Sequence, residues 1–137
     1  MVDTLFWHNS EVSGVMPCPT SRGCVQLVLS AGAVERQQDD ASGRSTESGF
    51  LAPLVLMFEQ AQLTGPIGDC LGSMAHGELR LRSEDARAQS CVTLPWHCDQ
   101  ALILQLQFRN GSTLQIEAAS ARCVPTDDAR FRVSYAC

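Results

Sequence analysis

The stretch "LILQLQFRNGSTLQIEA", residues 102–118, decides the fold. Two runs in it repeat apolar side chains at every second position, and Asn110-Gly111 stands between them. This period is typical of β-strands with one buried face, so the stretch predicts an antiparallel hairpin at the centre of the core. The inward face is expected to comprise Leu102, Leu104, Leu106, Phe108, Leu114 and Ile116. The outward face, towards solvent or a neighbouring chain, is expected to comprise Gln105, Gln107 and Gln115.

The length of the connecting loop sets the register of this hairpin. A two-residue turn at Asn110-Gly111 is a common connection, but it would place Leu106 opposite Gln115 and send the two apolar faces to opposite sides of the sheet. A three-residue loop, 109–111, places Leu106 opposite Leu114 and gives its glycine the left-handed position of a bulge. A five-residue loop would also keep the faces in phase. The sequence therefore predicts a loop with an odd number of residues.

The rest of the chain has the same short alternating runs, separated by Gly, Pro, Ser, Asn and Asp. These patterns are typical of an all-β protein. The expected strands cover residues 11–16, 24–30, 54–60, 78–82, 90–94, 102–109, 113–119 and 130–135. We expect residues 1–137 to form a single domain, an antiparallel β-sandwich or flattened barrel, with at most one or two short helical turns near residues 68–77.

Three segments carry more specific expectations. The strand "ELRLR", residues 78–82, is expected to pair with "SCVTL", residues 90–94, because both have one apolar face. The run "LVLM", residues 54–57, predicts a central strand covered on both faces. Residues 35–49, "ERQQDDASGRSTESG", contain no large apolar side chain and are expected to form a long polar loop that is either disordered or functional.

Charge and composition exclude several classes of function. The chain has 137 residues and a net charge of −5, and all ten of its basic residues are arginine. An acidic protein gains no counterion-release affinity for nucleic acid, and no stretch approaches the ~20 apolar residues that span a bilayer. The N-terminal residues lack the pattern of a signal peptide. We therefore expect a cytoplasmic protein that binds neither nucleic acid nor membranes, and the absence of lysine indicates a GC-rich bacterial genome.

The seven cysteines are irregularly spaced, at Cys18, Cys24, Cys70, Cys91, Cys98, Cys123 and Cys137. An odd number in a chain of this length is unlike a secreted disulfide scaffold. No pair has the short spacing that is common in zinc sites. We expect all of them to be reduced and structural, and the terminal Cys137 to be exposed.

Two Trp-His pairs, in "LFWHNSEV" at residues 5–12 and "LPWHCDQ" at residues 94–100, are the candidate functional segments. They could be strand ends at the rim of a sheet, a patch that binds a partner, or a split metal or acid–base site that also includes Cys98. His76 is expected in a turn. The candidate partner-binding residues are Trp7, His8, Asn9, Trp96, His97 and Asp99. The candidate metal ligands are His8, Glu11, His97 and Asp99.

The opening "LFWHNSEV" resembles the F-H-D-S/A-x-L/V start of many small bacterial β proteins, some of which are similar to immunity proteins of polymorphic toxin systems. The later order of "LVLMFEQA", "GELRLR" and "LQLQFRNGSTLQIEAASARC" is similar too. His8 matches the histidine of that pattern, whereas Asn9 replaces its acid. The resemblance implies an all-β interaction protein with no catalytic role.

We therefore expect a non-enzymatic, cytosolic interaction protein without a cofactor, which binds a protein partner or associates with itself. No nucleotide-binding, hydrolase or metalloprotease motif occurs in the sequence. Two alternatives remain open. One is a metal-dependent enzyme that uses His8 and His97. The other is a carrier of a small apolar ligand, with the sheet closed around the ligand.

Overall fold

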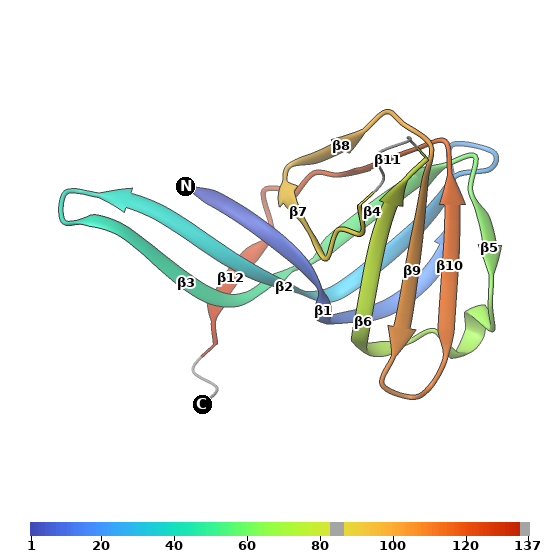
Figure 1. The fold of residues 1–137 in the computed structure, drawn as a ribbon, viewed down its shortest axis with the longest axis horizontal. Helices are drawn as coiled ribbons and strands as arrows, with labels where there is room; N and C mark the ends of the chain where they lie inside the picture. Colours follow the sequence, from blue (N-terminus) through green and yellow to red (C-terminus); the bar gives the residue numbers. More distant parts are fainter. Residues whose placement is uncertain (83–86, 135–137) are drawn as a thin grey trace.

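A computed structural model describes residues 1–82 and 87–134, so Tyr135 and Cys137 lie outside the described residues. The described residues form twelve β-strands and one short 3-10 helix, which confirms the all-β prediction (Figure 1). The elements are β1 (Val2–Pro17), β2 (Val25–Asp40), β3 (Gly43–Ala52), β4 (Leu54–Glu59), β5 (Gln62–Thr64), η1 (Ile67–Asp69), β6 (Gly72–Leu81), β7 (Cys91–Leu94), β8 (Trp96–Cys98), β9 (Leu102–Phe108), β10 (Thr113–Ala118), β11 (Ser120–Cys123) and β12 (Arg130–Val133).

All strands belong to one open antiparallel sheet, in the order β5-β10-β9-β6-β1-β2-β4-β11-β8, from which β3, β7 and β12 branch. The sheet curls over itself: β6, β9, β10 and β5 form the front layer in Figure 1, and β2 and β4 run behind them. The only pairing between β6 and β1 in the described chain joins Glu11 to Ser73 and Val12 to Gly72. The two layers expected of a sandwich are therefore two parts of one sheet around one buried cluster.

The β9–β10 hairpin has the predicted register. Leu106 pairs with Leu114, and Leu104 pairs with Ile116. The loop has three residues, 109–111, because the Phe108 N–H donates to the Ser112 carbonyl at 2.8 Å. Gly111 adopts a φ of 91°, the left-handed conformation expected of it. The six predicted inward side chains are all buried, with exposed fractions of 0% to 2%.

The expected polar loop at residues 35–49 is instead most of a long β-hairpin made by β2 and β3. Backbone pairing runs without a break from Gly32↔Leu51 to Asp40↔Gly43. This hairpin extends away from the two-layered body in Figure 1. Residues 37–48 are exposed on both faces, so the strands have no buried side that would require apolar side chains at every second position. The prediction was wrong because it relied on that periodicity.

Two other expectations about strands also need correction. The segments "ELRLR" and "SCVTL" do not form a strand pair, because β6 pairs with β9 and β7 pairs with β1. A single bridge joins Leu79 to Gln89, the residue just before "SCVTL". Strand β4 lies between β2 and β11, as expected of a central strand. Only its alternate residues, such as Leu56, are fully buried, so one face of β4 is covered and the other is partly exposed.

The cysteines do not all have the expected reduced state. Cys18 and Cys24 form a disulfide across the β1–β2 connection, with their Cα atoms 5.2 Å apart. The Cys18 N–H also donates to the Cys24 carbonyl at 2.9 Å, so the backbone of this turn already holds the two residues together. Free and buried cysteines are Cys70, Cys98 and Cys123, and Cys91 is free and half-buried.

The opposite environments of Leu104 and Gln105 predict opposite effects of truncation. Leu104→Ala should lower the free energy of unfolding by about 2–5 kcal/mol, because it removes a side chain that is completely buried. Gln105→Ala should change it by less than about 0.5 kcal/mol, since Gln105 is exposed. Urea denaturation of the two variants measures both effects. Equal losses would mean that the faces of β9 have been assigned incorrectly.

The disulfide closes a loop with a sequence separation of only 6 residues. Replacing both cysteines, as Cys18→Ser with Cys24→Ser, should therefore lower the free energy of unfolding by only about 2 kcal/mol. Urea denaturation with and without a reductant measures this loss. The reductant should destabilise the wild-type chain by a similar amount and leave the double variant unchanged. An equal response of both proteins to the reductant would contradict the disulfide.

Candidate functional site

The first Trp-His segment lies in a large bulge of β1. The pairing of β1 with β2 jumps from Phe6↔Ala33 to Glu11↔Ala31, so residues 7–10 face a single residue of β2. Such a bulge bends its strand and changes the direction of the side chains that follow. The bulge is the point at which β1 exchanges one neighbour for another, because residues 3–6 pair with β7 and residues 11–12 pair with β6.

The Ser10 hydroxyl closes this bulge from inside. Its Oγ donates to the Phe6 carbonyl at 2.6 Å and accepts the Ala33 N–H at 2.8 Å. These bonds replace ladder hydrogen bonds that the bulge interrupts, and Ser10 is completely buried. Asn9 takes a left-handed φ of 70°, which asparagine tolerates better than most residues. Its Oδ1 accepts a hydrogen bond from Arg109 at 2.6 Å.

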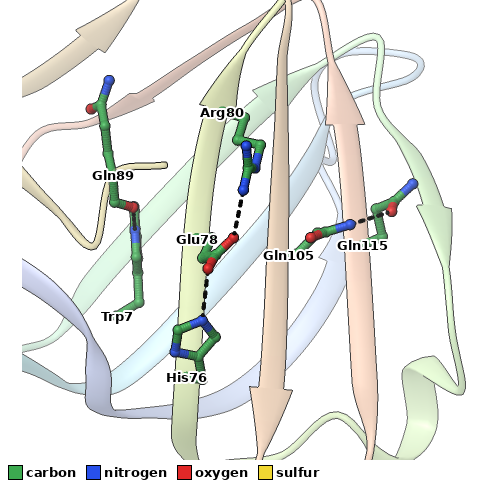
Figure 2. Close-up of polar contacts among 7 residues, drawn as sticks. All are labelled: Trp7, His76, Glu78, Arg80, Gln89, Gln105 and Gln115. Carbon is green, nitrogen blue, oxygen red and sulfur yellow. Dashed lines mark hydrogen bonds and ion pairs between the residues drawn. The ribbon is translucent and has the colours of Figure 1, made fainter. Parts of the chain in front are cut away.

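Trp7 is a core residue and not a surface one. Its side chain is 0% exposed, and its Nε1–H donates to the Gln89 carbonyl at 3.1 Å (Figure 2). The indole lies against Gly77 of β6, where a Cβ would stand 2.3 Å from the Cβ of Trp7. Trp96 is also buried, and the two indole rings meet edge to face with their centroids 6.1 Å apart. The prediction that Trp7 and Trp96 contact a partner was wrong, because the core encloses both.

The histidines that follow the tryptophans point to the outside, in different places. His8 and Asn9 line a hollow of about 290 Å3, which we name the His8 hollow. His97 and Asp99 line a separate hollow of only about 90 Å3, beside Arg122. Within the described part of the chain, no three His, Cys, Asp or Glu side chains gather in a way that could hold a metal ion. The structure therefore brings the tryptophans together and leaves the expected ligands in separate hollows.

The sheet face that carries the His8 hollow is unusually apolar for an outer face. Strand pairing aligns Phe6 with Ala33, Ala33 with Phe50, and Phe50 with Arg132 across β1, β2, β3 and β12. We name the apolar part of this surface, Phe6, Ala31, Ala33, Phe50 and Ala52, the Ala-Phe face. Phe50 is 36% exposed, and the other four side chains are partly exposed.

Phe50 stands between two hollows on the Ala-Phe face. It lines the His8 hollow on one side. On the other side it lines a hollow of about 610 Å3, which we name the Arg130 hollow. The floor of both hollows is made of small residues, because alanines occupy the neighbouring positions of β2 and β3. The lining of the Arg130 hollow comprises Glu11, Ser30, Ala31, Phe50, Ala52, Arg130 and Arg132.

Charged groups surround this apolar floor. Glu35 lines the His8 hollow, and the carboxylate of Glu11 lines the Arg130 hollow, where it accepts a hydrogen bond from Ser30 at 3.2 Å. Within the described residues, the Arg130 guanidinium donates to the backbone carbonyls of Asp127, at 2.8 Å, and Ala129, and its charge also acts on the carboxylate of Asp128. Arg132 has no carboxylate within ion-pair distance among the residues that the structure describes. The face therefore has a charged rim whose arginines form no short ion pair within the described chain.

A buried ion pair holds β12, and with it both of these arginines, in place. Arg36 donates to the two carboxylate oxygens of Asp3 at 2.8 and 2.9 Å. Its guanidinium also lies 4.3 Å from the ring centroid of Phe131, on the inner side of β12. The hydrogen bond to Asp3 raises the pKa of Arg36. Phe131 points inward, and its neighbours Arg130 and Arg132 therefore point outward.

The outer face of β6, β9 and β10 is different, because its polar groups bind one another. His76 and Arg80 both contact the carboxylate of Glu78, at 3.1 and 3.3 Å, and Gln105 donates to Gln115 at 3.0 Å (Figure 2). The hydrogen bonds with His76 and Arg80 lower the pKa of Glu78. His76 lies within strand β6, so its expected place in a turn was wrong. We name these five residues the polar face.

Two of the free cysteines, Cys70 and Cys123, have thiols of raised pKa. Burial raises the pKa of the Cys123 thiol to about 12, and it raises the pKa of Cys70 as well. Since the thiolate is the nucleophilic form, neither residue reacts readily at neutral pH.

The chain matches no protein-family model, no curated protein and no solved structure in the three comparisons made. Within the described residues, no helix has the length and the apolar character needed to cross a membrane.

Sequence analysis found His8 and Asn9 but missed Phe50 and the alanines of the same face. A signal was present in "GFLA", residues 49–52, where adjacent apolar residues in a strand must point to opposite faces. The expected loop at residues 35–49 obscured this signal, because it included Gly49, the first residue of the stretch.

The two hydrogen bonds of Ser10 predict a specific loss of stability. Ser10→Ala should lower the free energy of unfolding by about 1–3 kcal/mol, because it leaves the Ala33 N–H in the bulge without its acceptor. Ser13→Ala is the matched control, since Ser13 is exposed and the hydrogen bond that its hydroxyl forms within the described residues is 3.4 Å long. It should cost less than about 0.5 kcal/mol. Thermal denaturation compares the two variants, and equal stabilities would show that the bulge does not need the hydroxyl.

Proposed function

We propose that this protein is a protein-binding domain and that its partner docks on the Ala-Phe face. The observation that carries the proposal is the position of Phe50, exposed at the centre of an apolar floor between two hollows. The inner face of the same strands is already buried, with Val34 at 2% and Leu51 at 3% exposure. Strands that are apolar on both faces are usually covered on both sides, which favours a partner on the outer side.

The arrangement of residue types supports the same proposal. Protein interfaces commonly have an apolar centre with an aromatic or arginine anchor and a polar rim. The Ala-Phe face offers Phe50 as the aromatic residue, Arg130 and Arg132 beside it, and Glu11 and Glu35 around the floor. The polar face also has a hollow, of about 370 Å3 beside His76, Gln105 and Gln115, but its side chains are hydrophilic and bind one another. Binding is therefore assigned to the Ala-Phe face.

The contacts of the described residues do not support either alternative, a metal-dependent enzyme or a carrier of a small apolar ligand. The expected ligands of a metal enzyme, His8 and His97, line different hollows. A carrier needs space between the layers of the sheet, but Leu56, Phe58 and Phe108 fill the interior with exposed fractions of 0% to 1%. The absence of enzymatic activity and the likeness to immunity proteins stay predictions from the sequence.

The cellular location also stays a prediction. The Cys18–Cys24 disulfide favours an oxidising compartment and not the expected cytoplasm, because cytosolic thiols are usually kept reduced. The proposed docking does not depend on which is correct, since neither cysteine lines the Ala-Phe face.

Site-specific photo-crosslinking in the cells that make the protein tests the proposal. Benzoyl-phenylalanine in place of Phe50 should give a covalent adduct with one defined protein, because the ring of Phe50 would lie inside the interface. The same group in place of Gln105, on the polar face, should give no such adduct. Adding Ala33→Arg to the first variant should abolish the adduct, since a large charged side chain would fill the floor of the His8 hollow.

Mass spectrometry of the adducts identifies the bound protein, which is either another protein or a second copy of this chain. No adduct at position 50, or equal adducts at positions 50 and 105, would contradict the proposal. Far-UV circular dichroism checks that each variant has kept its fold.

A further inference from the structure

We infer that the occupant of the Ala-Phe face is a second copy of this chain, bound about a two-fold axis that runs parallel to the strands. The inference rests on the proposed function and adds the identity of the partner. A two-fold interface is self-complementary: every group on the face must meet a suitable group at the position that the axis assigns to it. The Ala-Phe face meets this condition in charge and in size.

Charge is the first element of this self-complementarity. Glu11 lies on β1 and Arg130 lies on β12, at opposite ends of the four-stranded face and on two sides of the Arg130 hollow. Three strand spacings, about 14 Å, separate the outer strands. A two-fold axis above the gap between β2 and β3 places β1 of one copy over β12 of the other. Glu11 of each copy then faces Arg130 of the other, and two equivalent ion pairs form.

Side-chain size is the second element. The same axis places β2 of one copy over β3 of the other, so Ala33 faces the second copy's Phe50. A large side chain thus meets a small one, and each Phe50 has a hollow of about 290 Å3, lined by Ala33, to enter. Phe6 faces the second copy's Arg132, which is a suitable pair for a cation–π contact. Packed sheets with nearly aligned strands are a common arrangement in β-proteins.

The charge balance of the face favours a second copy over another protein. The rim has two carboxylates, Glu11 and Glu35, and two arginines, Arg130 and Arg132, although the chain as a whole carries a net charge of −5. An acidic partner would oppose the carboxylates, and a basic partner would oppose the arginines. A partner that carries both signs in the reverse order avoids this opposition, and the two-fold axis gives that order for Glu11 and Arg130.

Sedimentation equilibrium of the purified chain tests this inference with a charge-swap cycle. The wild-type chain should form a reversible dimer. Glu11→Arg and Arg130→Glu should each raise the dimer Kd by about tenfold or more, because each places like charges opposite one another. The double variant with both changes should recover most of the wild-type affinity, since the pairs re-form with their signs exchanged. Arg122→Glu, on β11 outside the face, is the matched control and should dimerise like the wild-type chain.

A wild-type chain that stays monomeric at the highest soluble concentration would overturn the inference. So would a double variant that is as weak as the two single variants. After either result, a photo-adduct between position 50 and a different protein would still support the proposed function. If no such adduct formed, both the inference and the proposed function would be contradicted. Thermal melting of each variant distinguishes a loss of the dimer from a loss of the fold. A loss of the fold is not expected, because Glu11 and Arg130 are both exposed.

Discussion

The contact between Trp7 and Gly77 is the constraint on which the rest of the structure depends. It lies where β1 leaves β7 and joins β6, and the indole can occupy that place only because residue 77 has no side chain. The Nε1–H is satisfied by the Gln89 carbonyl, so the core gains a large aromatic group without an unpaired polar atom. Burying such a group is favourable by roughly 2–3 kcal/mol or more. The sheet thus curls at one bulge of β1, where the Trp7 side chain is held by Gly77 of β6 and by the carbonyl of Gln89.

The same bulge determines what the outer face presents. Ser10 keeps the bulge closed from inside, and pairing resumes at Glu11 with its carboxylate on the outer side, beside the Arg130 hollow. On the inner face of the sheet, Arg36 is held by Asp3 and contacts the ring of Phe131 in β12. This contact fixes β12 and so orients its arginines. The apolar floor and its charged rim are therefore positioned by buried contacts, which makes the Ala-Phe face a preformed surface. Such a surface loses little conformational entropy when it binds.

The sequence predicted the parts of the fold in which one face of a strand is buried and the other is not. In the β9–β10 hairpin, the phase of Leu106 and Leu114 was sufficient to choose a three-residue loop over the more common turn. Prediction failed in the two situations where that contrast is missing. The arm formed by residues 37–48 is polar on both faces, and residues 49–52 are apolar on both. The burial of both tryptophans was also missed, because it depends on segments far apart in the chain, such as Gly77 opposite Trp7.

The central claim is that the Ala-Phe face, and not the polar face, is covered in the working protein. Methyl NMR of the labelled chain over a range of protein concentrations tests it most directly. The methyl signals of Ala31, Ala33 and Ala52 should shift with concentration along one saturating curve, because they form the floor that a second copy covers. The methyl signals of Ile103 and Thr113, in β9 and β10, should stay constant. Shifts at Ile103 and Thr113 with constant alanine signals would contradict the account.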